Sequence, residues 1–301
     1  KLDASSRDHL LGQIESIDWP EVTRLVKTHV LHNPPLQLPR DIEPAVCFPN
    51  TPTDILKDKY ERARREGERL VREGKVAVFT VAGGQGTRLG WSRPKGTYPA
   101  TPITQTSLFG CIAGFMQKVQ QKFGTPIPWY VMTSPVNDVQ TRQFFDQHAY
   151  FGLDPSLVFM FPQQMMPAID LDTGRVLLEA KDRIALAPNG HGGSLKALLT
   201  NGVLEKMKRQ GIEQISYIQV DNPSVKVIDP LFLGLHALEG AQMSSKMLPK
   251  AYPQEKLGNF CLVDGKVSVI EYSNMPEALA EQRLENGELR FRAGSIAIHA
   301  M

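Results

Sequence analysis

The sequence has few cysteines, no long apolar run and little net charge, and each absence excludes a class of protein. Its three cysteines are widely spaced and odd in number, which fits reduced cytoplasmic thiols better than a disulfide framework or a metal site. No apolar run reaches the ~20 residues that cross a bilayer, and the N-terminus lacks the apolar core of a signal peptide. A net charge of +2 argues against a nucleic-acid-binding protein, which would carry a concentrated basic stripe.

The most informative stretch is an apolar run that ends in a glycine-rich turn. Residues 75–82 are mostly apolar and rich in β-branched side chains, which predicts a strand buried on both faces. Four glycines follow within residues 83–90, and a turn of this kind aims several N–H groups at one point. Arg88 and Lys95 add positive charge nearby. The stretch therefore predicts a site for nucleotide phosphates, although it matches neither the Walker loop nor the full dinucleotide fingerprint.

Strands and helices alternate along the rest of the chain. The patterning predicts N-terminal helices over 5–17 and 20–30, a proline-rich connector over 33–52, and a charged, solvated helix over 54–73 that Thr53 caps. This rhythm is typical of a parallel sheet covered by helices. Further strands are expected over 127–133, 157–161 and 214–220, further helices over 107–123, 135–148 and 193–210, and a hairpin with an Asp-Gly turn over 262–267.

Several other residues could carry chemistry, and each also has an ordinary structural role. Asp221, at the end of a predicted strand, could hold Mg²⁺ or accept hydrogen bonds from turn N–H groups. Gln163 could read the imide edge of uracil or lie on the surface. His191, in the glycine-dense turn 187–193, could bond to a sugar hydroxyl or only satisfy the turn. Glu271 could accept bonds from sugar hydroxyls or be a surface acid at a strand edge. No Ser/His/Asp or Cys/His nucleophile set is visible.

A set of segments in a fixed order over residues 69–301 resembles a known family. The most particular segment is Gln-Val-Asp-Asn-Pro at 219–223, which is followed by Val-Lys-Val at 225–227 and Asp-Pro at 229–230. The other matching segments are 82–90, Pro94-Lys95-Gly96, Gln163 through Pro167-Ala168, 187–193 and 271–273. Together they resemble the UDP-sugar pyrophosphorylases, in particular the UDP-N-acetylglucosamine pyrophosphorylase branch.

The resemblance implies a fold and a reaction. The fold is α/β: a Rossmann-like nucleotidyltransferase domain over 69–301, with a mixed, mostly parallel central sheet and flanking helices, which we expect to be truncated at the C-terminus. A small helical segment with the proline-rich connector, residues 1–68, precedes it. The implied enzyme is a uridylyltransferase that uses Mg²⁺ and joins UTP to a sugar 1-phosphate by direct attack on the α-phosphorus. Its products are UDP-N-acetylglucosamine, or a related UDP-hexose, and pyrophosphate.

The resemblance also implies a role for individual residues. Arg88 and Lys95 are the expected catalytic residues, because they bind the nucleotide's phosphates. The expected nucleotide-binding residues are Ala82, Gly83, Gly84, Gln163, Gly190 and Asp221, and Asp221 also places the magnesium ion. The expected sugar-binding residues are His191, Asn222 and Glu271.

Two positions depart from the family's pattern, and both fall in its sugar pocket. His191 stands where the acetamido-sugar branch usually has Asn, and Ile298 replaces an Asn that contacts the sugar. Because isoleucine cannot form that hydrogen bond, two alternatives stay open. One is a pyrophosphorylase of the UDP-glucose or UDP-galactose type, and the other is a non-catalytic UDP-sugar-binding module. The sequence indicates neither the oligomeric state nor any regulation.

Overall fold

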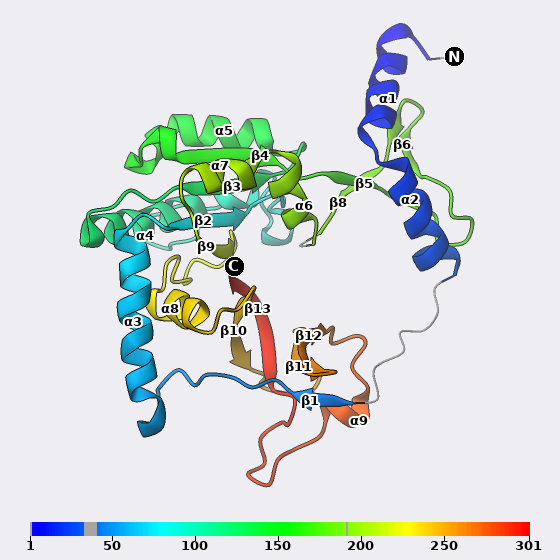
Figure 1. Ribbon diagram of the computed structural model, residues 1–301. Helices are drawn as coiled ribbons and strands as arrows, with labels where there is room; N and C mark the ends of the chain where they lie inside the picture. The colour runs from blue at the N-terminus through cyan, green and yellow to red at the C-terminus, as the bar shows by residue number, and fades with distance from the viewer. Residues whose placement is uncertain (1, 33–40, 191) are drawn as a thin grey trace.

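The computed structural model describes residues 2–32, 41–190 and 192–301, and a mixed sheet lies at its centre (Figure 1). In spatial order the strands are β1 (Ile42–Pro44), β11 (Asn259–Val263), β13 (Ala293–Ala300), β9 (Gln214–Gln219), β2 (Val76–Val81), β3 (Trp129–Thr133) and β4 (Val158–Pro162). From β9 to β4 all neighbours are parallel, whereas the pairs from β1 to β9 are antiparallel. Two strands extend the antiparallel half: β10 (Ser244–Pro249) pairs with β13, and β12 (Lys266–Ile270) pairs with β11.

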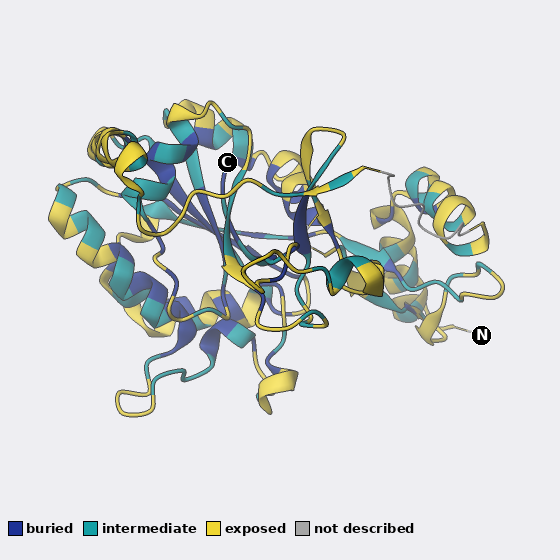
Figure 2. Ribbon diagram, turned by 90° about the horizontal axis from the view of Figure 1, so that it is seen from below, coloured by how far each residue is buried: buried dark blue, intermediate teal, exposed yellow. Residues whose placement is uncertain are grey.

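Helices cover both faces of the sheet. Successive residues of a strand point to opposite sides, so an apolar strand has side chains to bury on each face. Val76 and Val78 of β2 belong to one hydrophobic cluster, and Ala77 and Phe79 belong to another. The first cluster is completed by α3 (Lys57–Arg72), α4 (Leu108–Phe123), α5 (Asp138–Gln147) and α8 (Pro230–Leu238), and the second by α6 (Gly192–Thr200) and α7 (Val203–Arg209). The strand before the glycine turn is therefore buried on both faces, as predicted (Figure 2).

A narrow two-stranded arm leaves the sheet after β4 and lies against the N-terminal helices (Figure 1). Its strands are β5 (Met165–Pro167), β6 (Leu178–Ala180), β7 (Arg183–Ile184) and β8 (Leu186–Pro188), with β5 paired to β8 and β6 paired to β7. The helices α1 (Ala4–Ser16) and α2 (Trp19–Leu25) flank this arm, on the side of the molecule away from α3. Helices and arm share a small hydrophobic cluster of their own around Ile17, Val22 and Ile184.

The predicted α/β fold is confirmed, and two local expectations were wrong. The connector predicted over 33–52 contains β1, which pairs with β11; its residues 33–40 lie outside the described ones. Thr53 forms no side-chain cap, and a 3₁₀ turn, Asp54–Leu56, precedes α3. The helix predicted over 20–30 is present: it is α-helical to Leu25 and continues as a π-helix, Val26–Leu31. No helix of the described residues is long and apolar enough to cross a membrane.

Candidate functional site

The glycine turn after β2 is held by side chains from the connection between β3 and α5. Asn137 donates from Nδ2 to the carbonyl oxygens of Ala82 at 2.9 Å and Gly84 at 3.3 Å. Ser134 donates from its hydroxyl to the carbonyl oxygen of Gly83 at 2.9 Å. Both side chains are buried, so these bonds are protected from competition by water. The carbonyl groups of three consecutive residues are therefore drawn toward the protein interior.

Three consecutive N–H groups of the same turn have no hydrogen-bond partner among the residues that the structure describes. Within the described part of the chain, the backbone N–H groups of Gly83, Gly84 and Gln85 donate no hydrogen bond. The turn closes as a small loop, because the N–H of Lys95 donates to the carbonyl oxygen of Gly84 at 3.1 Å. Consecutive unpaired N–H groups in a turn can form an anion-binding concavity. The structure leaves these groups available to a phosphate, and the phosphate site stays a prediction.

Gln163 lies directly behind this turn. Only 5% of its surface is exposed, and its backbone N–H donates to the carbonyl oxygen of Thr133 at 2.9 Å. Its side-chain amide forms no hydrogen bond with any residue that the structure describes. A Cβ atom built on Gly83 would lie 2.2 Å from the Gln163 Nε2, so only glycine leaves room for the amide at this place. Neither amide atom is among the fully buried unpaired side-chain atoms of the described residues, and Gln163 lines a cavity, so a ligand with a complementary polar edge could bond to the amide there.

Lys95 and Asp221 meet at the carboxyl end of the sheet. The Nζ of Lys95 lies 3.0 Å from Oδ2 of Asp221. The pairing follows from topology, since β2 and β9 are parallel neighbours and their C-terminal ends lie at one edge. Asp221 is 40% exposed and Lys95 is 21% exposed, so both groups can be reached from solvent. A cation and an anion thus stand together beside the unpaired N–H groups.

The remaining predicted nucleotide contacts are accessible and lightly constrained. Arg88 is exposed on the 3₁₀ turn Thr87–Leu89, and it forms no ion pair with another described residue. Gly190 follows β8 with φ +63°, in the left-handed region that favours glycine, and a Cβ there would meet nothing within 4 Å. Both positions leave open space for a ligand to approach.

The residues expected to bind the sugar are less well gathered. His191 lies outside the described residues. The Oδ1 of Asn222 accepts a hydrogen bond from the N–H of Ser224 at 3.1 Å, which folds its own turn. Glu271 is exposed just after β12, in the antiparallel half of the sheet. Ile298 is 6% exposed and packs in the main hydrophobic cluster, so its side chain has a packing role.

Ser134 and Asn137 were not predicted as site residues. The sequence places them only at the end of a strand and the start of a helix, which is typical of capping residues. Their hydrogen bonds to the glycine turn join residues about fifty positions apart, and no local pattern indicates such a pairing. One feature of the sequence could have indicated a role in the site: both residues follow the carboxyl end of β3, a strand parallel to β2.

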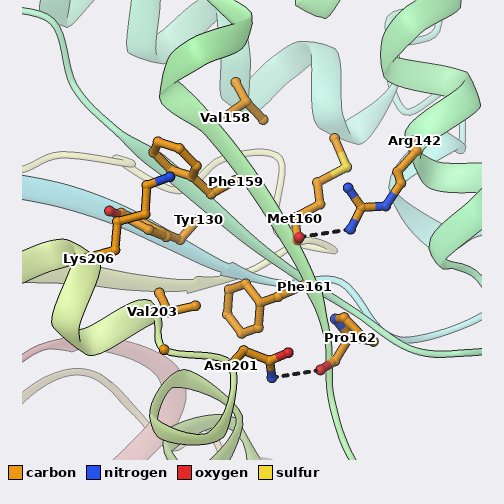
Figure 3. Close-up of a pocket in the computed structure, with 11 residues that line it drawn as sticks. Tyr130, Arg142, Val158, Phe159, Met160, Phe161, Pro162, Asn201, Val203 and Lys206 are labelled. Carbon is orange, nitrogen blue, oxygen red and sulfur yellow. Dashed lines mark hydrogen bonds between the residues drawn. The ribbon is translucent and has the colours of Figure 1, made fainter.

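A separate hollow of about 420 Å³ lies along the outer edge of β4 (Figure 3). There Arg142 donates from Nη2 to the carbonyl oxygen of Met160 at 2.8 Å, and Asn201 donates from Nδ2 to that of Pro162 at 3.3 Å. Lys206 lies over the ring of Phe159. These side chains occupy backbone acceptors that an edge strand would otherwise offer to another chain. Because β3 separates this hollow from β2, it is no part of the site around the glycine turn.

Comparison with known proteins decides the family. The family model described as UTP--glucose-1-phosphate uridylyltransferase matches residues 44–298. The chain belongs to this family. The "UDP-N-acetylhexosamine pyrophosphorylase-like protein 1" of Homo sapiens is 40% identical over 277 residues, which are 89% of this chain and 54% of that protein. The "UDP-N-acetylglucosamine pyrophosphorylase" of Saccharomyces cerevisiae is 36% identical over 238 residues, 78% of this chain and 50% of that protein.

The solved structures confirm the fold of this family. The uridine diphosphate N-acetylglucosamine pyrophosphorylase of Trypanosoma brucei, solved with an inhibitor, superposes with a TM-score of 0.83 at 26% identity, covering 99% of this chain and 61% of that one. The UDP-glucose pyrophosphorylase of Leishmania major superposes at 0.70 and 17% identity, covering 100% of this chain and 64% of that one, which shows the fold alone. The chain spans about half the length of the first curated relatives it matches.

Proposed function

We propose that the protein is a UTP:sugar-1-phosphate uridylyltransferase that forms UDP-N-acetylglucosamine or a related UDP-hexose. The observation that carries this proposal is the group at the sheet edge: unpaired N–H groups at 83–85, with the Lys95–Asp221 pair beside them. Membership of the family, and curated relatives named for this activity, support it. The sugar 1-phosphate and UTP are the substrates, and the UDP-sugar and pyrophosphate are the products.

The proposed chemistry needs no covalent enzyme intermediate. An oxygen of the sugar 1-phosphate attacks the α-phosphorus of UTP, and the bond from that phosphorus to the β-phosphate oxygen breaks to release pyrophosphate. The N–H groups of residues 83–85 bind phosphate oxygens, while Arg88 and Lys95 neutralise charge on the reacting phosphates. Gln163 and Gly190 bind uracil and fix the direction of the nucleotide. Catalysis then rests on positioning and on fixed positive charge.

Asp221 is the residue that would hold Mg²⁺. The described residues contain no group of three or more His, Cys, Asp or Glu side chains that could bind a metal by themselves. Many Mg²⁺ ions in proteins are held by one or two carboxylates together with phosphate oxygens of the substrate. The partly exposed carboxylate of Asp221, next to the proposed phosphate site, fits such a coordination. When bound, the ion would offset the negative charge of the triphosphate.

The sugar is the open part of the proposal. We propose that the sugar binds next to Asn222, Glu271 and His191. N-acetylglucosamine is the leading candidate, and glucose or galactose is the alternative. The buried, apolar Ile298 favours the alternative, because it offers a sugar no hydrogen bond. We also propose that residues 69–301 form the catalytic unit and 1–68 the N-terminal segment. The three cysteines are free thiols, which supports a cytoplasmic location.

The test is pyrophosphate release by the protein in its full length, with UTP, Mg²⁺ and a panel of hexose 1-phosphates. Absence of turnover with every sugar, together with measurable UDP-sugar binding, would favour the non-catalytic module. Lys95→Ala should lower kcat by about 100-fold or more, since a fixed charge on the reacting group is lost. UDP-sugar binding should weaken far less. Lys57→Ala, at an exposed lysine of α3, is the control and should change neither.

A further inference from the structure

The root of the arm carries both residues assigned to uracil. Gln163 stands two residues before β5, and Gly190 stands two residues after β8. The first pair of the ladder, Met165 with Pro188, joins the two segments directly beside them. A displacement of the arm would therefore shift Gly190 with β8, while the backbone of Gln163 stays bonded to Thr133 of β3 and the glycine turn of β2 stays fixed by Asn137.

The arm is a narrow ribbon that stands away from the main sheet. Its ladder between β5 and β8 has three residue pairs and is continued by backbone bonds among Ala168, Leu177 and Ala185. A narrow ribbon of this kind is marginally stable in water without further packing. Its apolar side chains, such as Met166 and Leu186, pack against Ile17 and Val22 from the N-terminal helices. Figure 1 shows α1 and α2 along the arm, and Figure 2 shows that this end of the molecule is far less buried than the sheet. The helices thus supply the core that the arm lacks.

Gln13 of α1 fastens the helices to the arm through main-chain atoms. Its Oε1 accepts a hydrogen bond from the N–H of Ile184 at 2.8 Å, and its Nε2 donates to the carbonyl oxygen of Ile184 at 3.4 Å. The amide therefore pairs with β7 much as a neighbouring strand would. Asp18, at the start of α2, lies 3.5 Å from Lys196 of α6. Contacts from the N-terminal helices thus reach β7 on one side of the glycine-dense turn and α6 on the other.

No printed hydrogen bond or ion pair among the described residues joins α1 to Gln163. Instead, His9, Gln13 and Ser16 of α1 line the same cavity of about 530 Å³ as Gln163. The hydrogen-bonded path from α1 toward the nucleotide site therefore runs through the arm.

We infer that the N-terminal helices position the uracil-binding end of the nucleotide site, with Gln13 as the positioning residue. The inference rests on the proposed function, because it takes Gln163 and Gly190 as nucleotide contacts. Loss of the Gln13 bonds loosens the arm, so the N–H groups of residues 165–188 exchange faster with solvent. The binding-competent arrangement of the uracil site is then populated for a smaller fraction of the time, and the apparent affinity for the nucleotide falls. Asn222 and Glu271, two of the expected sugar contacts, lie outside the arm, so binding of the sugar 1-phosphate should change less than binding of UTP.

The experiment compares Gln13→Ala, Gln13→Glu and the control Glu15→Ala in the protein at its full length. Glu15 is exposed on the same helix. For Gln13→Ala we expect KM for UTP to rise about five- to thirtyfold, because two hydrogen bonds of ordinary net strength are lost. We expect kcat and KM for the sugar 1-phosphate to stay within about twofold of the wild-type values. Gln13→Glu keeps the acceptor for the N–H of Ile184 but turns a carboxylate oxygen toward the carbonyl oxygen of Ile184, so KM for UTP should rise at least as much. Hydrogen exchange should quicken in residues 165–188, and Glu15→Ala should match the wild type.

The outcomes separate this inference from the proposed function. A wild-type protein that neither binds UTP nor turns it over overturns both. A wild type that binds UTP, with Gln13→Ala showing the same KM and the same exchange, overturns the positioning role alone. Equal losses in kcat and in both KM values would assign Gln13 to general stability and also overturn it. If Gln13→Ala fails to fold, Gln13→Glu decides by the same criteria.

Discussion

Replacing Gly83 with alanine tests the placement of Gln163 behind the glycine turn. The new Cβ atom would lie 2.2 Å from Nε2 and 3.2 Å from Cδ of Gln163, and 3.3 Å from the carbonyl oxygen of Thr133. The first distance is impossible for real atoms, so the amide must turn away. Gly83 does not have a positive φ, so alanine adds no backbone strain there. The change should therefore act mainly on the Gln163 side chain, with a shift of a few tenths of an ångström at the carbonyl group of Thr133.

The expected loss is set by the hydrogen bonds that the displaced amide would make to a uracil. A net hydrogen bond contributes about 0.5–1.5 kcal/mol, and the imide edge of the base offers the amide two of them. UTP should therefore bind about 1–3 kcal/mol more weakly, a rise in Kd of about 5- to 150-fold. Calorimetric titration with UTP measures it, and the thermal midpoint should fall only slightly. Gly114→Ala, where a Cβ would meet nothing within 4 Å, is the control and should leave Kd unchanged.

A double substitution makes this test sharper. If Gly83→Ala acts only through Gln163, then Gly83→Ala combined with Gln163→Ala should bind UTP as Gln163→Ala alone does. Additive losses would show that the new methyl group blocks the nucleotide itself. A Gly83→Ala protein with the Kd of the wild type would refute the assignment of Gln163 to the base.

Two further predictions concern the support beneath the site. Gly67→Ala should lower the free energy of unfolding by about 3 kcal/mol in urea titrations, because its Cβ would lie 1.7 Å from the carbonyl oxygen of Pro230 and force α3 away from α8; an unchanged midpoint would contradict this packing. Burial opposes the charge of Asp229, yet its hydrogen bond with Lys246 and the charge of that lysine hold the pKa of the carboxyl below its ordinary value. A lowered pKa stabilises the fold above the unfolded-state pKa of about 3.9 and loses this effect as the pH falls through the folded value. Asp229→Asn should therefore cost about 1–3 kcal/mol at pH 7 and progressively less below about pH 4, whereas Asp54→Asn, in an exposed pair, should cost little at any pH.

The glycine turn shows how far local sequence reasoning reaches. A β-branched run followed by glycines and two cations predicted the strand, the turn and the open N–H groups, because each depends on neighbouring residues. The Lys95–Asp221 pair needed one more rule, that parallel strands end at one edge. The role of Ser134 and Asn137 was not predicted, because it depends on which backbone atoms come within 3 Å of their side chains after folding. Contacts between residues so far apart in the chain produce no periodic or local sequence pattern.

The helix α3 shows what patterning leaves out. Its dense charges indicated a solvated helix face, and another face of the helix, with Tyr60, Ala63 and Gly67, is buried. That face was not predicted, because Ala63 and Gly67 carry little hydrophobic signal. Their value is steric: Gly67 and Gly234 allow the backbones of α3 and α8 to touch, as a Cβ on Gly234 would lie 1.7 Å from the carbonyl oxygen of Ala63. Close helix packing of this kind depends on what is absent from a side chain, and composition does not report it.

The parallel half of the sheet supports the groups assigned to the nucleotide's phosphates. The turn at 83–85 and Lys95 follow β2, Asp221 follows β9, and β2 and β9 pair over six residues. The expected sugar contacts are divided, since Asn222 also follows β9, whereas Glu271 follows β12 in the antiparallel half. Among the described residues, that half pairs with β9 through β13, at His299 with Tyr217 and Ala300 with Ser216. A substitution at the exposed Glu271 can therefore change the sugar pocket with little effect on the phosphate site, whereas Ile298 packs in the same core as β2 and a change there would reach further. The preferred sugar is therefore best determined by kinetics.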